Sequence, residues 1–240
     1  MSSLSSRPVP RRERLIAALD VPAAEDARRL VAALGDAVCF YKLGLELLAS
    51  GGCFALLAEL VGAGNKVFLD LKLHDIPETV GRAVRNLRGR GASFVTVHYG
   101  ECQLEAACRE AGGELGVLAV TLLTSIDRAG LRDLGYPDAM APGDLVVARA
   151  RRALEIGCAG VVASPLEAHR IRQQVGEKLA IVTPGIRPQP AADDQRRIAT
   201  PREAFLNGVD HIVVGRPIHA APDPRAAALA IQATIAELFG

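Results

Sequence analysis

Short apolar runs alternate with longer amphipathic segments along the chain. The runs are rich in Val, Ile, Leu and Ala and carry few charges, as expected for parallel strands that are covered on both faces. We predict eight strands, at residues 15–21, 38–44, 66–73, 93–99, 115–124, 160–164, 180–185 and 211–218.

Helix signals occupy the segments between these runs. Several candidates have proline in the first turn and glycine just after the last turn, the usual asymmetry of helix ends. The predicted helices cover residues 23–34, 45–63, 77–90, 102–111, 144–156, 165–175, 201–206 and 224–239.

The alternation of strands and helices over 240 residues predicts one α/β domain, a (β/α)8 TIM barrel spanning residues 14–240. Residues 1–13, rich in serine and arginine, are expected to form a disordered leader. A doubly wound open sheet is the alternative, but no GxGxxG motif follows the first strand. Two long connections, 125–143 and 187–199, are candidate lids or simply solvated loops.

Charged residues stand where three neighbouring strands are expected to end. They are Asp20, Lys42, Asp70, Lys72 and Asp75. Active sites of such barrels lie at the carboxyl ends of the strands. Residues two apart on a strand share a face, so Asp70 and Lys72 should point together into the barrel mouth. A structural ion-pair network is the simpler interpretation of one such pair, but three adjacent charged strand ends favour a ligand site.

Composition narrows the possible partners and compartment. The net charge of +1, from 28 basic and 27 acidic residues, gives no general attraction to nucleic acid or membrane. No apolar run is long enough for a secretory signal or a membrane span. The five cysteines have no CxxC spacing, which favours free thiols in a reducing compartment. We therefore expect a cytoplasmic protein.

The segment DLKLHDIPET, residues 70–79, resembles the active-site signature of the orotidine 5'-phosphate decarboxylases. The D-x-K-x-x-D part is shared with other sugar-phosphate barrels, whereas the HDIPET continuation is much more specific. Further similar motifs run through nearly the whole chain: ALD, YKLG, VTVH, LLTS, SPLEA, TPGIRP, DDQRR and VVGRPI. The resemblance implies decarboxylation of orotidine 5'-phosphate to uridine 5'-phosphate and carbon dioxide, in de novo pyrimidine biosynthesis, without metal or cofactor.

The same resemblance implies a catalytic role for each charged residue of the mouth. Lys72 would protonate C6 of the pyrimidine, and Asp70 would lie beside the departing carboxylate. Lys42 and Asp75 would complete an alternating Lys–Asp–Lys–Asp row. Asp75 and Thr79 would come from the other subunit of a homodimer whose active sites are shared.

Substrate-binding residues are implied in the same way. Asp20, Lys42 and Thr79 would contact the ribose hydroxyls, and Thr124 would lie near the base. The phosphate would be held by Arg187, Gln195, Gly215 and Arg216. The physical chemistry of the phosphate end supports this, because arginine binds phosphate through two parallel hydrogen bonds and glycine allows close approach of the backbone.

Two other functions stay open at this point. One is a related magnesium-dependent enzyme, a 3-keto-gulonate-phosphate decarboxylase or hexulose-phosphate synthase. The other is a barrel that binds nucleotides without catalysis. Of the histidines, His98 is expected to be structural, and His74 receives no catalytic role.

Overall fold

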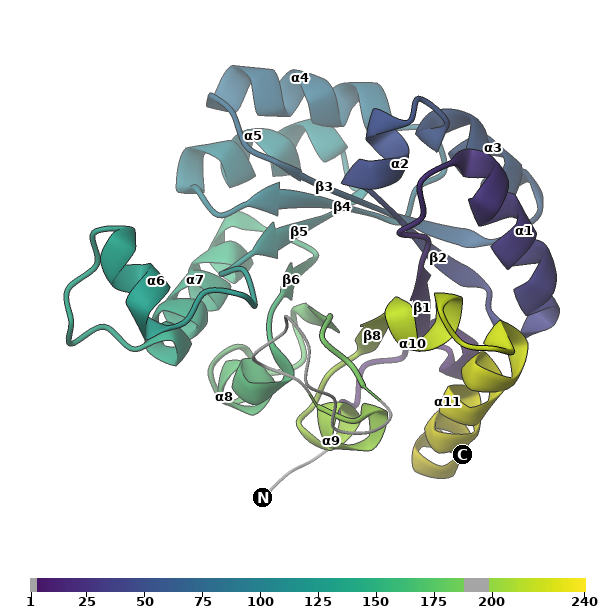
Figure 1. The fold of residues 1–240 in the computed structure, drawn as a ribbon. Helices are drawn as coiled ribbons and strands as arrows, with labels where there is room; N and C mark the ends of the chain where they lie inside the picture. The colour runs from purple at the N-terminus through teal and green to yellow at the C-terminus, as the bar shows by residue number, and fades with distance from the viewer. Residues whose placement is uncertain (1–3, 188–198) are drawn as a thin grey trace.

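Eight parallel strands close into a barrel in the computed structural model, which describes residues 4–187 and 199–240 (Figure 1). The strands are β1 Leu15–Ala18, β2 Phe40–Gly44, β3 Lys66–Leu73, β4 Phe94–His98, β5 Gly116–Val120, β6 Gly160–Val162, β7 Ala180–Thr183 and β8 His211–Val214. The helices are α1 Ala24–Leu34, α2 Leu45–Ala49, α3 Cys53–Gly62, α4 Pro77–Leu87, α5 Glu101–Ala111, α6 Arg128–Asp133, α7 Pro142–Ile156, α8 Pro165–Val175, α9 Pro201–Leu206, α10 Arg216–His219 and α11 Pro224–Phe239.

The barrel has two separate apolar cores, as its two-sided strands require. One lies inside the barrel and contains Ile16, Phe40, Phe68, Leu118 and Val213 with their neighbours. The larger core lies between the outer faces of the strands and the surrounding helices. Each strand is paired with the next, and β1 pairs with β8, so no sheet edge is left open. The predicted TIM-barrel fold is confirmed.

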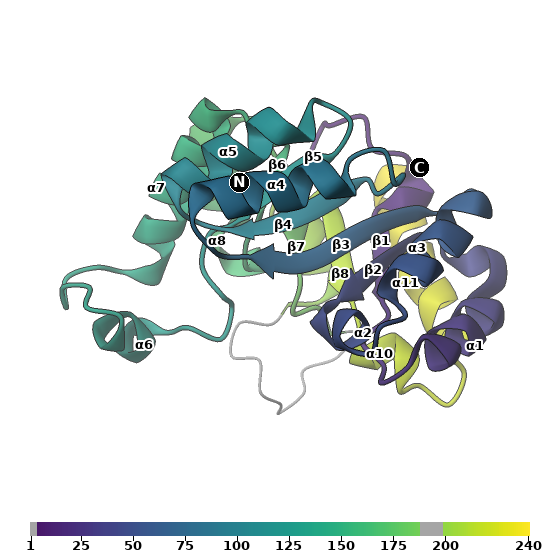
Figure 2. The same cartoon turned by 90° about the horizontal axis from the view of Figure 1, so that it is seen from above.

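The structure differs from the predicted elements at one helix, one strand and one connection. The expected helix 45–63 is two helices, α2 and α3, because Gly51 takes a left-handed conformation with φ 82°. The expected strand 211–218 ends early, and the four-residue helix α10 follows it. The connection 125–143 contains α6, which projects away from the barrel in both views (Figures 1 and 2).

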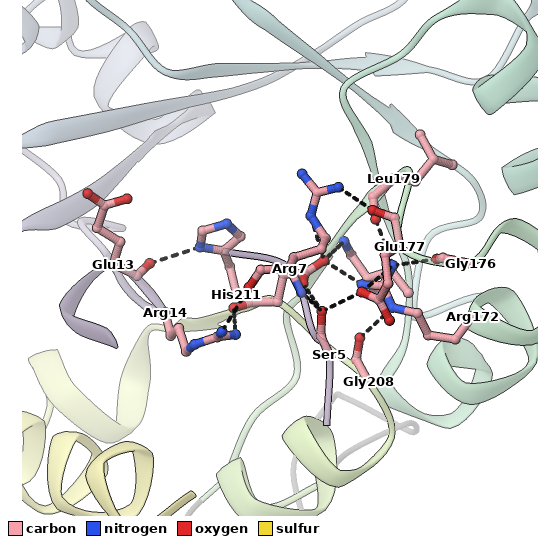
Figure 3. A network of polar contacts seen from close by, with 12 residues as sticks. Ser5, Arg7, Glu13, Arg14, Arg172, Gly176, Glu177, Leu179, Gly208 and His211 are labelled. Atoms are coloured by element: carbon pink, nitrogen blue, oxygen red, sulfur yellow. Dashed lines mark hydrogen bonds and ion pairs between the residues drawn. The ribbon is translucent and has the colours of Figure 1, made fainter. Parts of the chain in front are cut away.

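Residues 4–13, which belong to the leader expected over residues 1–13, make defined contacts with the barrel. The Ser5 hydroxyl is buried and lies 2.5 Å from Asp210 Oδ1. Arg7 forms an ion pair with the same carboxylate, and a 3-10 turn follows at Arg11–Glu13. The buried carboxylate of Asp210 needs polar partners, and this segment supplies a hydrogen bond from Ser5 and an ion pair with Arg7. Figure 3 shows this network of polar contacts at the amino ends of the strands.

Among the described residues, no helix has both the length and the apolar character needed to cross a membrane.

Candidate active site

A cavity of about 650 Å³ opens at the carboxyl ends of the strands. This is the end at which barrels of this kind hold their reacting groups. Its walls include residues from strands β1, β2, β3, β5, β6, β7 and β8 or from the turns that follow them. Nine polar, charged or glycine residues of interest line it: Asp20, Lys42, Asp70, Lys72, Thr124, Arg187, Gly215, Arg216 and His219.

A row of alternating charges crosses one wall of this cavity. Lys42 Nζ lies 2.8 Å from Asp20 Oδ1 and 3.4 Å from Asp70 Oδ2. Lys72 Nζ lies 2.7 Å from the same Asp70 oxygen. The structure therefore brings four predicted site residues together in the order Asp20, Lys42, Asp70, Lys72.

Burial and charge oppose each other at the centre of the row. Burial disfavours the Lys42 ammonium, but the carboxylates of Asp70 and Asp20 outweigh burial, so the pKa of Lys42 is raised. Burial likewise disfavours the Asp70 carboxylate, yet Lys42, Lys72 and a hydrogen bond from Thr96 lower its pKa below the ordinary value. Both groups are therefore charged at neutral pH.

The backbone of β3 is irregular where it carries this chemistry. Lys72 has φ 47°, the one positive φ outside glycine among the described residues. In the pairing with β4, Leu69 lies opposite Val95 and Leu73 lies opposite Val97. Three residues of β3, 70–72, thus face Thr96 alone, which makes a bulge. A left-handed conformation in a residue other than glycine costs about 1–3 kcal/mol and persists only where surrounding contacts hold it.

Thr96 is a site residue that the sequence reasoning missed. Its hydroxyl is completely buried, accepts a hydrogen bond from the Lys72 amide at 2.9 Å and donates one to Asp70 Oδ1 at 3.0 Å. The available signal was a hydroxyl in the middle of the apolar run FVTVH, since a buried hydroxyl needs a partner.

Asp75 and Thr79 are not part of the cavity wall. Both are exposed, on the turn after β3 and in the first turns of α4. Ile76 between them exposes 64% of its surface, an unusual value for isoleucine. One chain alone therefore supplies Lys42, Asp70 and Lys72 of the expected Lys–Asp–Lys–Asp row, but not Asp75.

Three predicted anion-binding residues line the cavity after β7 and β8, and Gly215 borders Asp20 because β8 pairs with β1. Arg187 follows β7, is buried, and donates through Nη1 to the carbonyl of Ile186 at 2.9 Å. Gly215 and Arg216 follow β8, and Arg216 begins the short helix α10. The loops after strands 7 and 8 and a short extra helix are the common phosphate position of these barrels. Gln195, the fourth predicted phosphate ligand, lies outside the described residues.

The histidines near the mouth divide into two groups. His219 lines the cavity on the α10 side, a position that the sequence did not reveal. His98 at the end of β4 lies outside the cavity wall and packs against His74, with ring centroids 5.3 Å apart. Burial lowers the pKa of His98, and electrostatic interactions with His74, Lys72 and Arg149 lower it further.

Comparisons with known proteins agree with this geometry. Residues 13–231 match the model of the orotidine 5'-phosphate decarboxylase / HUMPS family. A protein of Methylococcus capsulatus named orotidine 5'-phosphate decarboxylase is 53% identical over 238 residues, which cover 98% of this chain and 97% of the relative. One of the same name from Rhodopseudomonas palustris is 53% identical over 229 residues, covering 94% and 96%.

Solved structures give the same result. The orotidine 5'-phosphate decarboxylase of Lactobacillus acidophilus superposes with a TM-score of 0.81 at 36% identity, covering 93% of this chain and 99% of that one. The orotidine 5'-phosphate decarboxylase of Pyrococcus horikoshii gives a TM-score of 0.74 at 28% identity, covering 92% of this chain and 99% of that one.

Proposed function

The chain belongs to the orotidine 5'-phosphate decarboxylase / HUMPS family, and on that premise we propose that it decarboxylates orotidine 5'-phosphate to uridine 5'-phosphate in pyrimidine biosynthesis. The observation that carries the proposal is the row of Asp20, Lys42, Asp70 and Lys72 on one wall of the cavity. Two predicted anion-binding arginines, Arg187 and Arg216, line the same cavity.

Lys72 is the group to which we assign the proton transfer. Loss of carbon dioxide from C6 leaves an electron pair that the pyrimidine ring delocalises poorly. A fixed ammonium where this negative charge develops stabilises the transition state and can then donate its proton to carbon. The Lys72 ammonium is held by Asp70 at 2.7 Å and keeps about 30% of its side chain exposed to the cavity region. It is therefore both oriented and accessible to a substrate.

Asp70 has two effects in this scheme. It positions Lys72 and Lys42, since both ammonium groups approach its Oδ2 atom. It would also lie beside the substrate carboxylate, and two like charges at ~4 Å repel by about 4 kcal/mol at an effective dielectric constant of ~20. That repulsion disappears when neutral carbon dioxide leaves. We give more weight to the preorganised ammonium groups than to this repulsion.

The remaining substrate contacts are those that the family resemblance implies, and the described residues among them line the cavity. We propose that Asp20 and Lys42 bind the ribose hydroxyls and that Thr124 contacts the base. Arg187, Gly215 and Arg216, with Gln195, bind the phosphate. Binding energy from this remote phosphate can then be used to orient the reacting end.

We also propose that two copies of the chain form a homodimer with shared sites. The support is that Asp75, Ile76 and Thr79 are exposed close in sequence to Lys72 but absent from their own cavity wall. In such a dimer, Asp75 and Thr79 would enter the cavity of the second copy, and Ile76 would be covered by it.

The cytoplasm is the proposed location, because all five cysteines are free thiols, as expected in a reducing compartment.

The test is a direct assay with purified protein. Orotidine 5'-phosphate and EDTA are mixed with the enzyme, and the loss of substrate absorbance is followed with uridine 5'-phosphate identified as product. We expect full activity in EDTA. Activity that requires added Mg²⁺, or turnover of a hexulose phosphate instead, would favour the magnesium-dependent relative. Tight binding of uridine 5'-phosphate without turnover would favour a non-catalytic barrel.

A further inference from the structure

Thr96 occupies a position between the two central groups of the charged row. Its single hydroxyl donates to Asp70 Oδ1 at 3.0 Å and accepts from the backbone amide of Lys72 at 2.9 Å. The hydroxyl proton thus binds Asp70 and a hydroxyl lone pair binds the Lys72 amide, and both residues belong to the bulge. Thr96 is completely buried and does not line the cavity, so it has no access to a substrate.

The bulge needs such a partner. Residues 70–72 lie opposite Thr96 alone, so the Lys72 amide cannot take the regular ladder position on β4. Its hydrogen bond goes to the threonine side chain instead. Without that bond, a buried amide would lose its acceptor while Lys72 kept an unfavourable φ of 47°. The expected response is a shift of the backbone toward a more regular strand.

The same hydroxyl fixes the orientation of the carboxylate. The two lysines approach Asp70 Oδ2, at 2.7 Å from Lys72 and 3.4 Å from Lys42, while Thr96 holds Oδ1. A carboxylate anchored through one oxygen presents the other in a fixed direction. Thr96 Oγ1 therefore restrains the Lys72 ammonium in two ways, through the backbone amide of Lys72 and through the Asp70 carboxylate that binds the ammonium.

We infer that Thr96 is a positioning residue for the decarboxylation: through one hydroxyl it holds the left-handed backbone of Lys72 and the carboxylate of Asp70, and so places the Lys72 ammonium. This inference rests on the proposed function. Displacement of a reacting group by about 1 Å can lower a rate by about 100-fold. The phosphate residues lie on other strands, so binding should be affected much less than turnover.

The test compares four proteins: the wild type, Thr96→Val, Thr96→Ser and Thr121→Val. Valine keeps the shape of threonine and removes the hydroxyl, whereas serine restores it. Thr121 is the matched control, because its hydroxyl is equally buried near the end of β5 and donates to the carbonyl of Val162 at 2.9 Å, away from the charged row. We measure kcat, KM, the Kd for uridine 5'-phosphate and the melting temperature.

We expect Thr96→Val to lose about 10–100-fold in kcat, with KM and the product Kd changed less than about threefold. Thr96→Ser should recover most of the rate, and Thr121→Val should turn over like the wild type. If Thr96→Val does not fold, the pair Thr96→Ala and Thr96→Ser makes the same comparison, and serine must be clearly faster.

Three results would overturn the positioning role. They are an unchanged kcat in Thr96→Val, equal losses in the serine and valine variants, or an equal loss in Thr121→Val. A wild-type protein without decarboxylase activity would instead overturn the proposed function itself, whereas an active wild type with a fully active Thr96→Val removes only the role of Thr96.

Discussion

Each end of the barrel contains a buried carboxylate surrounded by cations, but only one of the two carboxylates lies beside an open cavity. At the amino ends, Asp210 is fully buried, and Ser5, Arg7, Arg172 and the amide of Ile181 all contact it. At the carboxyl ends, Asp70 contacts two lysines and Thr96 beside an open cavity.

The difference lies in what surrounds the cations. Arg172 is held by the carbonyls of Gly176, Leu179 and Gly208 as well as by Asp210, so its charge is fully engaged within the protein. The Lys72 ammonium has Asp70 as its one ion-pair partner among the described residues and reaches the cavity. Similar ingredients thus make a closed structural network at one end and an accessible reactive group at the other.

The largest effect should come from Lys72→Ala. Loss of a general acid costs about 10²–10⁴-fold and loss of a transition-state charge about 10²–10³-fold, so kcat should fall by roughly 10⁴-fold or more. The melting temperature should stay close to the wild-type value. Lys66→Ala is the control, since Lys66 lies at the opposite end of the same strand and is half-exposed. A Lys72 variant that keeps most of its kcat would refute the assigned role.

Asp210→Asn should give the opposite result, a loss of stability with little change in the chemistry. The change breaks a buried ion pair and leaves Arg172 with the partly exposed Glu177, at 3.8 Å, which should cost up to about 3–5 kcal/mol in the free energy of unfolding. Urea denaturation measures the loss, and kcat of the folded fraction should be unchanged. Asp36→Asn is the control, because this carboxylate pairs with Arg225 while 80% exposed, and its loss should change the free energy of unfolding far less. Equal losses in both variants would erase the distinction between buried and exposed pairs.

Arg216→Ala should have an intermediate effect on binding alone. A hydrogen bond to a charged group contributes about 1.5–3 kcal/mol, so kcat/KM should fall roughly 10–100-fold. A substrate that lacks the phosphate should lose almost nothing, and equal losses for both substrates would contradict the assignment. Arg202→Ala is the control, an exposed arginine that pairs with Glu237 on the outer helices.

The smallest effect is a pH dependence that arises at the amino ends. His211 is buried against Phe40 and Phe94, and its Nδ1 lies 2.8 Å from the Glu13 carbonyl. Burial lowers its pKa, so the unfolded chain takes up this proton first as pH falls. Stability should therefore be full above pH ~6.5 and decline below it.

Urea denaturation between pH ~7.5 and ~5 measures this decline, above the range in which carboxylates titrate. His211→Gln should show a shallower decline. Part of the slope should remain, because the pKa of His98 is lowered too. A variant with the full wild-type slope would exclude His211 as the source.

The strands and the central cluster could be predicted from sequence because their signals are local. Apolar runs mark the strands, and a charged residue at the carboxyl end of such a run is expected at the mouth of the barrel. Asp20, Lys42, Asp70 and Lys72 were predicted to converge on this ground. The assignments of Asp75 and Thr79 rest on family resemblance, since nothing in the spacing indicates a second subunit.

The features that escaped prediction depend on contacts distant in sequence. Regular strand alternation predicted that Asp70 and Lys72 lie together. In the structure a bulge brings them together, and this bulge is hydrogen-bonded to Thr96 on another strand. The ordered amino-terminal segment depends on Asp210, about 200 residues away. The local composition, rich in serine and arginine, is the same whether or not a distant partner binds the segment, so it cannot reveal these contacts.

The bulge in β3 also bears on protein engineering. The D-x-K pair would not function if it were grafted onto a regular strand of another barrel, because an uninterrupted ladder leaves no room for Lys72 at φ 47°. The transferable unit is a two-strand cassette, residues 66–73 together with 94–98. A designer who copied the charges without the neighbouring threonine would reproduce the motif and lose its geometry.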